Sequence, residues 1–173
     1  MVNGRSCNEP GQVALVNRGR PMNKNARKSG GLVRPRLLLA ENHIGMRERV
    51  VQLLERPFDV VGVVADGRAL LEAASLMKPD VCVIDISLPG LSGIEAAIQL
   101  RELGLKARLV FLTMHEDPDY LRVALAAGAS AYVVKSRMAS DLCLAIREAM
   151  AGRLFVSRSV PYVTQNDQGE DMP

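Results

Sequence analysis

Five polar residues of this chain each end or follow an apolar run, and their side chains suit phosphate and hard cations. They are Glu41, Asn42, Asp85, Thr113 and Lys135. A carboxylate can act as a nucleophile and form an acyl phosphate, while an ammonium and a hydroxyl can bind phosphate oxygens. Carboxylate and amide oxygens are also the ligands that Mg²⁺ prefers. These residue types predict a site for magnesium-assisted phosphoryl transfer. That reaction depends mainly on positioning of the reacting groups and on electrostatic stabilisation of the transferring phosphoryl group.

Asp85 is the natural nucleophile of this set because it closes a continuous apolar run, "DVCVID" at 80–85. A carboxylate there is costly without a cationic partner, and Lys135 is the candidate partner. A structural Asp–Lys ion pair would explain these two residues equally well. Thr113, Glu41 and the glycine-containing loop after Asp85 favour the phosphoryl site. A phosphatase with an Asp nucleophile would usually carry a second Asp two residues later, where this chain has Ser87.

The elements that must position these residues alternate in type along the chain. Solid apolar runs predict strands, and the segments between them repeat apolar residues at helical spacing. The predicted strands are 36–40, 59–66, 80–85, 108–113 and 129–135, each followed by a helix, the last at 138–151. Such a pattern predicts an α/β fold with a doubly wound, five-stranded parallel sheet and five helices, flavodoxin-like with strand order 2-1-3-4-5. Ligands of such sheets bind at the carboxyl ends of the strands, where all five polar residues fall.

Charge and composition divide the chain into three parts. Residues 1–34 hold seven Lys and Arg against one acidic residue, whereas 36–155 hold 14 basic and 15 acidic residues. We therefore expect a disordered basic arm at 1–34, one domain at 35–153 and a flexible tail at 154–173. The arm is also a candidate for nonspecific, salt-sensitive nucleic-acid contact, without sequence-specific DNA binding.

The remaining composition argues for an intracellular protein. No apolar stretch approaches the roughly 18–20 residues that would span a membrane, so we expect a cytoplasmic protein without membrane contact. Cys7, Cys82 and Cys143 lack metal-ligand spacing and are interpreted as free thiols, two of them buried.

Three segments together carry a specific resemblance. "LLLAENH", "VCVIDISLPGLSGIEA" and "FLTMHEDPDYLRVALAAGASAYVVKS" resemble, in order and spacing, the receiver domain of two-component response regulators, particularly receivers that precede LuxR-type DNA-binding domains. The likeness covers about residues 36–153. It implies a signalling module and not an enzyme, which takes a phosphoryl group from a histidine kinase or phosphotransfer protein.

The resemblance also assigns roles to residues. It implies that Asp85 is the phospho-acceptor, and that Thr113 and Lys135 sense the phosphate. Glu41 and Asn42 would match the family's acidic pair and bind Mg²⁺ together with Asp85 and the backbone carbonyl of Ser87. Tyr132 matches the aromatic switch. Output would pass through helix four, strand five and helix five to a downstream protein or, on phosphorylation, to a second copy.

Two departures from the family pattern leave alternatives open. Asn42 stands where the family commonly has Asp, which predicts weaker magnesium binding and keeps open a pseudo-receiver that acts without phosphorylation. Only about 20 residues follow the last predicted helix, whereas a LuxR-type domain needs some 60. We therefore expect a stand-alone receiver without a DNA-binding domain. His43 is expected to cap or flank the first helix, and His115 is interpreted as a solvated loop residue near the mouth of the site.

Overall fold

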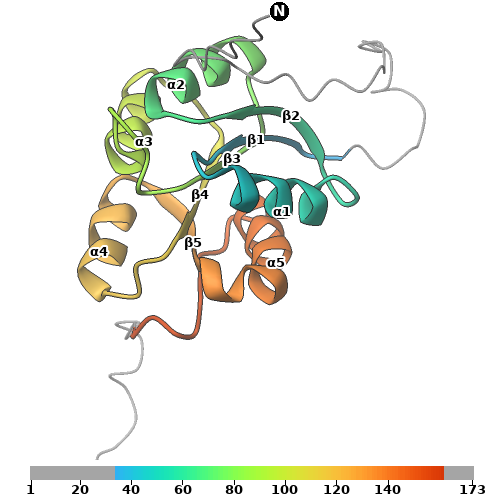
Figure 1. The fold of residues 1–173 in the computed structure, drawn as a ribbon. Coiled ribbons are helices and arrows are strands. Elements are labelled where there is room, and N and C mark those ends of the chain that lie inside the picture. The colour runs from blue at the N-terminus through green and yellow to red at the C-terminus, as the bar shows by residue number, and fades with distance from the viewer. Residues whose placement is uncertain (1–33, 162–173) are drawn as a thin grey trace, which may run out of the picture.

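The computed structural model describes residues 34–161, which form one parallel sheet with helices on both faces (Figure 1). The sheet has six strands in the order β2-β1-β3-β4-β5-β6. The strands are β1 (Arg36–Ala40), β2 (Asp59–Val64), β3 (Val81–Ile84), β4 (Arg108–Thr113), β5 (Ala129–Val134) and β6 (Phe155–Val156). The helices are α1 (Ile44–Leu54), α2 (Gly67–Met77), α3 (Gly93–Glu102), α4 (Pro118–Ala126) and α5 (Met138–Met150), with a short 3₁₀ turn, η1 (Lys135–Arg137), before α5. The predicted fold class and the order of the first five strands are confirmed.

Two hydrophobic cores cover the two faces of the sheet. Successive side chains of a strand point to opposite faces, so Leu38 and Ala40 of β1 pack towards α2 and α3, while Leu37 and Leu39 pack towards α1 and α5. Figure 1 shows α1 and α5 on one side and α2, α3 and α4 on the other. Because both faces are buried, the central strands contain apolar residues at every position, which is the pattern that the sequence shows.

Local signals explain where several helices begin. The Asp66 side chain accepts a hydrogen bond from the Ala69 backbone at the start of α2. Ser92 and Glu95 form a reciprocal capping box at the start of α3. Pro118 occupies the first turn of α4, where its missing N–H costs nothing. The strands end one or two residues earlier than predicted in β2, β3 and β5, so Asp85 and Lys135 lie just past their strands.

The domain extends beyond its predicted end at 153, because residues 155–160 pack against β5. The short strand β6 pairs in parallel with β5, with Val156 opposite Tyr132. The fully buried Ser157 accepts a hydrogen bond from the Val134 N–H and donates one to Asp141 Oδ2, at 3.2 and 2.8 Å. Val160 is also buried and joins the core on the α4 side of the sheet. This part of the sequence carries no strong strand signal, because only two residues pair.

The loop after β3 is closed tightly by Gly93. A Cβ atom at Gly93 would lie 2.0 Å from the carbonyl oxygen of Asp85, closer than real atoms approach. The Gly93 N–H donates to the Ile86 carbonyl at 3.0 Å. Only glycine therefore allows α3 to begin this close to the backbone of Asp85.

The buried thiol Cys82 lies in β3, and burial raises its pKa to about 12, which makes it unreactive at neutral pH. Cys143 is a partly buried free thiol. Cys7, the rest of the predicted arm before Arg34, and residues 162–173 of the predicted tail lie outside the described residues. Within residues 34–161, no helix has the length and apolar character needed to cross a membrane.

The β6 segment should contribute measurably to stability through Ser157. We expect Ser157→Ala to lower the free energy of unfolding by about 1–3 kcal/mol at neutral pH, because it leaves a buried N–H and a buried carboxylate short of one hydrogen bond each. Urea denaturation measures this change. Ser159→Ala, at an exposed position on the same segment, is the matched control and should have little effect.

The same substitution should alter acid stability in a defined direction. Burial raises the pKa of Asp141, but hydrogen bonds from Ser140, Ser157 and Arg137 outweigh it, so the pKa lies below its usual value of 3.8. A lowered carboxyl pKa contributes stability above pH 3.8 that is lost as the pH falls through the folded-state value. The destabilisation by Ser157→Ala should therefore shrink below pH 3.8. A difference that stays constant down to the acid transition would contradict this linkage.

The closure at Gly93 should be intolerant of a single methyl group. We expect Gly93→Ala to destabilise the domain by about 1–3 kcal/mol or more, because the added atom forces α3 away from Asp85. Gly45→Ala in α1 is the matched control, since a Cβ there meets nothing within 4 Å. It should leave stability unchanged or raise it by up to about 1 kcal/mol. Equal effects of the two substitutions would contradict the proposed steric cause.

Candidate functional site

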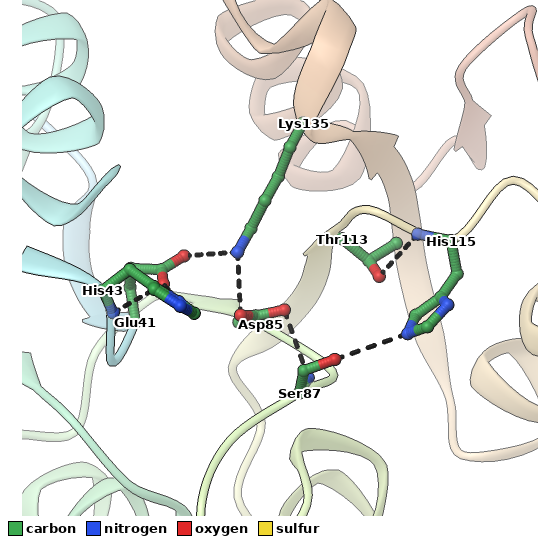
Figure 2. A network of polar contacts seen from close by, with 7 residues as sticks. All are labelled: Glu41, His43, Asp85, Ser87, Thr113, His115 and Lys135. Atoms are coloured by element: carbon green, nitrogen blue, oxygen red, sulfur yellow. Dashed lines mark hydrogen bonds and ion pairs between the residues drawn. The ribbon is translucent and has the colours of Figure 1, made fainter. Parts of the chain in front are cut away.

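The site lies at the carboxyl ends of β1, β3, β4 and β5, as the sequence predicts (Figure 2). Asp85 follows β3, the strand between β1 and β4, and its backbone N–H donates to the Ala40 carbonyl of β1 at 2.9 Å. Parallel strands end at the same edge of a sheet, so residues distant in sequence meet there. Glu41, Asp85, Thr113 and Lys135 are all buried.

Lys135 joins the two carboxylates of the site. Its Nζ lies 2.8 Å from Asp85 Oδ2 and 2.8 Å from Glu41 Oε2. The ammonium donates a hydrogen bond to Asp85 Oδ2 and forms an ion pair with Glu41 Oε2. Figure 2 shows the lysine side chain reaching down from the start of η1 between the two acids. All three side chains are at most 5% exposed, so solvent screens these charges weakly.

The charges of this group do not balance. Two carboxylates and one ammonium leave a formal charge of −1 in a buried place. Burial lowers the pKa of Lys135, but its contacts with Asp85 and Glu41 outweigh burial and raise the pKa above its usual value of 10.5. The lysine therefore stays charged at neutral pH, and a further cation would be attracted to the pair of acids.

The oxygens around this pair fit a hard divalent cation. Asn42 Oδ1 is buried without a hydrogen-bond partner among the residues described. Ligand atoms of Glu41, His43 and Asp85 lie within 4.8 Å of one another. The predicted ligand Ser87 lies next to the cluster, and its backbone N–H donates to Asp85 Oδ1 at 3.2 Å. A buried amide oxygen that lacks a hydrogen-bond donor, together with a net negative charge, suits such an ion.

Thr113 and Tyr132 are linked through the backbone of His115. Thr113 Oγ1 accepts a hydrogen bond from the His115 N–H at 3.1 Å, and the Tyr132 hydroxyl donates to the His115 carbonyl at 3.0 Å. Tyr132 is fully buried, and burial raises its pKa to about 12. Figure 2 places Thr113 on the opposite side of Asp85 from Glu41. The two residues to which the family resemblance gives roles in phosphate sensing and switching therefore belong to one hydrogen-bonded chain.

Two histidines are closer to the site than the sequence indicated. His43 is the residue before α1, as expected, but its side chain makes no cap hydrogen bond, and its Nδ1 lies 3.5 Å from Glu41 Oε1. His115 is partly buried, stacks on Tyr120 with 3.9 Å between ring centroids, and has its Nε2 3.4 Å from Ser87 Oγ. The interpretation of His115 as a solvated loop residue is therefore incomplete. Sequence patterns locate these residues in loops but do not give their side-chain directions.

Comparisons with known proteins agree with this geometry. The family model described as the response regulator receiver domain matches residues 37–147. The nitrate/nitrite response regulator protein NarL of Escherichia coli strain K12 is 32% identical over 126 residues, which are 72% of this chain and 58% of that protein. The transcriptional regulatory protein PdtaR of Mycobacterium tuberculosis is 36% identical over 67% of this chain and 57% of its own length. The chain thus spans less than two thirds of these two relatives.

Solved structures give the same result. A LuxR-family two-component response regulator from Aurantimonas sp. SI85-9A1 superposes with a TM-score of 0.71 at 35% identity, over 73% of this chain and 92% of that one. The signal receiver domain of the putative response regulator NarL from Mycobacterium tuberculosis superposes with a TM-score of 0.67 at 30% identity, over 69% of this chain and 98% of that one. The family match, the strand order and the buried acid–lysine group lead to one conclusion: this chain belongs to the response regulator receiver domains of two-component systems.

Proposed function

We propose that Asp85 accepts a phosphoryl group from a histidine kinase or phosphotransfer protein. The observation that carries this proposal is the buried Asp85 carboxylate at the end of a central strand, with the Lys135 ammonium 2.8 Å away. In the transfer, an Asp85 oxygen forms the new P–O bond while the P–N bond to the donor imidazole breaks, and that nitrogen regains an electron pair. The product is an acyl phosphate on Asp85.

The other residues of the site stabilise the added charge. Lys135 pairs with one phosphoryl oxygen. The Thr113 hydroxyl accepts from His115 in the present arrangement, which leaves its hydrogen for a second phosphoryl oxygen. Mg²⁺, held by Glu41, Asn42, Asp85 and the Ser87 carbonyl, would offset charge on the transferring group.

The phosphorylated state would reach the surface through Thr113 and Tyr132. When Thr113 turns towards a phosphoryl group, its bond to the His115 N–H is strained, and the His115 carbonyl holds the Tyr132 hydroxyl. Tyr132 belongs to β5, so the change is delivered to the face formed by α4, β5 and α5. The exposed apolar residues Tyr120 and Val123 of α4 suit contact with a downstream protein or a second copy of the chain.

One observation favours a second function. Asn42 brings an amide to the position where this family commonly has a carboxylate, which weakens the attraction for Mg²⁺. A pseudo-receiver that binds its partner without phosphorylation is therefore the alternative. It predicts partner binding that is unchanged in the Asp85→Asn variant.

Intact mass spectrometry after incubation with a small-molecule phosphodonor tests the leading proposal. We expect a gain of one phosphoryl group that requires magnesium and is absent in Asp85→Asn, because Asp85 is the buried carboxylate that accepts the Lys135 hydrogen bond and lies between Glu41 and Thr113. Labelling that persists in Asp85→Asn would contradict the assignment of the nucleophile. The absence of labelling in the native chain would favour the pseudo-receiver.

Restoring a carboxylate at position 42 should strengthen magnesium binding. Unit charges 4 Å apart interact by about 4 kcal/mol at an effective dielectric of 20, before desolvation. We expect Asn42→Asp to bind Mg²⁺ at least about tenfold more tightly, since tenfold corresponds to about 1.4 kcal/mol. Gln52→Glu, which adds the same charge at an exposed position of α1, is the matched control. Equal magnesium affinities for the native chain and Asn42→Asp would count against this explanation.

A further inference from the structure

Among residues 34–161, His43 is the residue that offers an imidazole nitrogen to the metal-ligand group of Glu41 and Asp85. Its Nδ1 lies 3.5 Å from Glu41 Oε1, and it forms with Glu41 and Asp85 a group whose ligand atoms lie within 4.8 Å of one another. Two ligands about 2.1 Å from one metal ion are about 3 Å apart when adjacent and about 4.2 Å apart when opposite. The 4.8 Å limit is wider than both spacings, so the three side chains must turn towards one another to bring all three ligand atoms onto one ion.

The backbone fixes the direction from which the imidazole approaches. The His43 N–H donates to Glu41 Oε1 at 3.0 Å, so the carboxylate and the base of the histidine side chain are tied together. Within residues 34–161, neither ring nitrogen makes a hydrogen bond, and the ring is not used to cap α1. The ring is 72% exposed, whereas Glu41 and Asp85 are buried. Figure 2 shows the ring beside Glu41, and its exposure leaves it room to turn a nitrogen towards the two acids.

The donor set of this site differs in chemistry from a set of oxygens alone. Asn42 supplies a neutral amide oxygen, and His43 adds an imidazole nitrogen. Mg²⁺ favours charged oxygen ligands and gains little from imidazole, whereas borderline first-row ions such as Mn²⁺, Co²⁺ and Zn²⁺ bind imidazole well. The net charge of −1 on the Glu41–Asp85–Lys135 group attracts both Mg²⁺ and the borderline ions. The selectivity of the site between them therefore depends on the nitrogen ligand.

We propose that His43 is a ligand of the divalent cation at Glu41 and Asp85, and that it shifts the preference of this site towards borderline transition ions. The inference deepens the proposed function, because it concerns the same cation site. It assigns the selectivity of the site to a residue of the loop between β1 and α1.

Titration with Co²⁺ and Mg²⁺ separately tests this assignment. We expect His43→Gln to weaken Co²⁺ binding by about 10–100-fold, the range seen when even an orienting partner of a metal ligand is lost. Its affinity for Mg²⁺ should not change. The visible absorption of bound Co²⁺ should also change in His43→Gln, because an oxygen or a water replaces the nitrogen ligand. A purely structural role would not move this band.

The second histidine provides the matched control. The chain contains only two histidines, so His115→Gln removes the other imidazole near the site and should leave the Co²⁺ affinity and spectrum unchanged. Far-ultraviolet circular dichroism verifies that both variants fold. Unchanged Co²⁺ binding in His43→Gln would overturn the inference, as would a parallel loss of Co²⁺ and Mg²⁺ affinity.

The outcome is separable from that of the proposed function. Magnesium-dependent labelling of Asp85 together with unaltered Co²⁺ binding in His43→Gln would support phosphoryl acceptance and overturn the role of His43. Loss of Co²⁺ binding in that variant, with no labelling of the native chain, would support the metal ligand and remove the phosphoryl function.

Discussion

The ionic group of Glu41, Asp85 and Lys135 is the constraint on which the site depends. Three charged side chains are buried within 2.8 Å contacts, and removal of Lys135 would leave two buried carboxylates without a counter-charge. Breaking such a group by deleting one partner typically costs about 3–5 kcal/mol, although apolar replacements of the whole group are often tolerated. A core without charges would therefore serve stability equally well. The arrangement is better explained by the chemistry it permits than by the stability it confers.

Much of the site could be predicted from the sequence because parallel sheets convert sequence order into spatial order. Each buried strand appears as an apolar run, and the first polar residue after it must lie at the carboxyl edge of the sheet. Glu41, Asp85, Thr113 and Lys135 follow this rule, and the structure brings them to one edge. The strand order followed from the number of alternating units. These features depend on periodicity and chain connectivity, which are properties of the sequence.

The features that were missed depend on side-chain directions and on very short pairings. The strand β6 contains two residues, too few for a periodic signal, and the Ser157 hydroxyl and the strand's backbone pairing with β5 hold it in place. The approach of His43 to Glu41 follows from one backbone hydrogen bond in a loop. The stacking of His115 on Tyr120 joins a loop to the first turn of a helix. In each case a single local contact determines the position of the residue, and no pattern in the sequence predicts that contact.

The contact between Gly93 and the Asp85 carbonyl has a mechanical consequence. No side-chain atom separates the start of α3 from the backbone of Asp85. A displacement of the Asp85 backbone therefore also displaces the start of α3. On the other side of the site, residues 114–117 connect β4 to α4, of which only Leu121 and Ala124 are buried. The two sides of the acid are thus packed unequally, because α3 contacts the Asp85 backbone directly whereas α4 buries only Leu121 and Ala124.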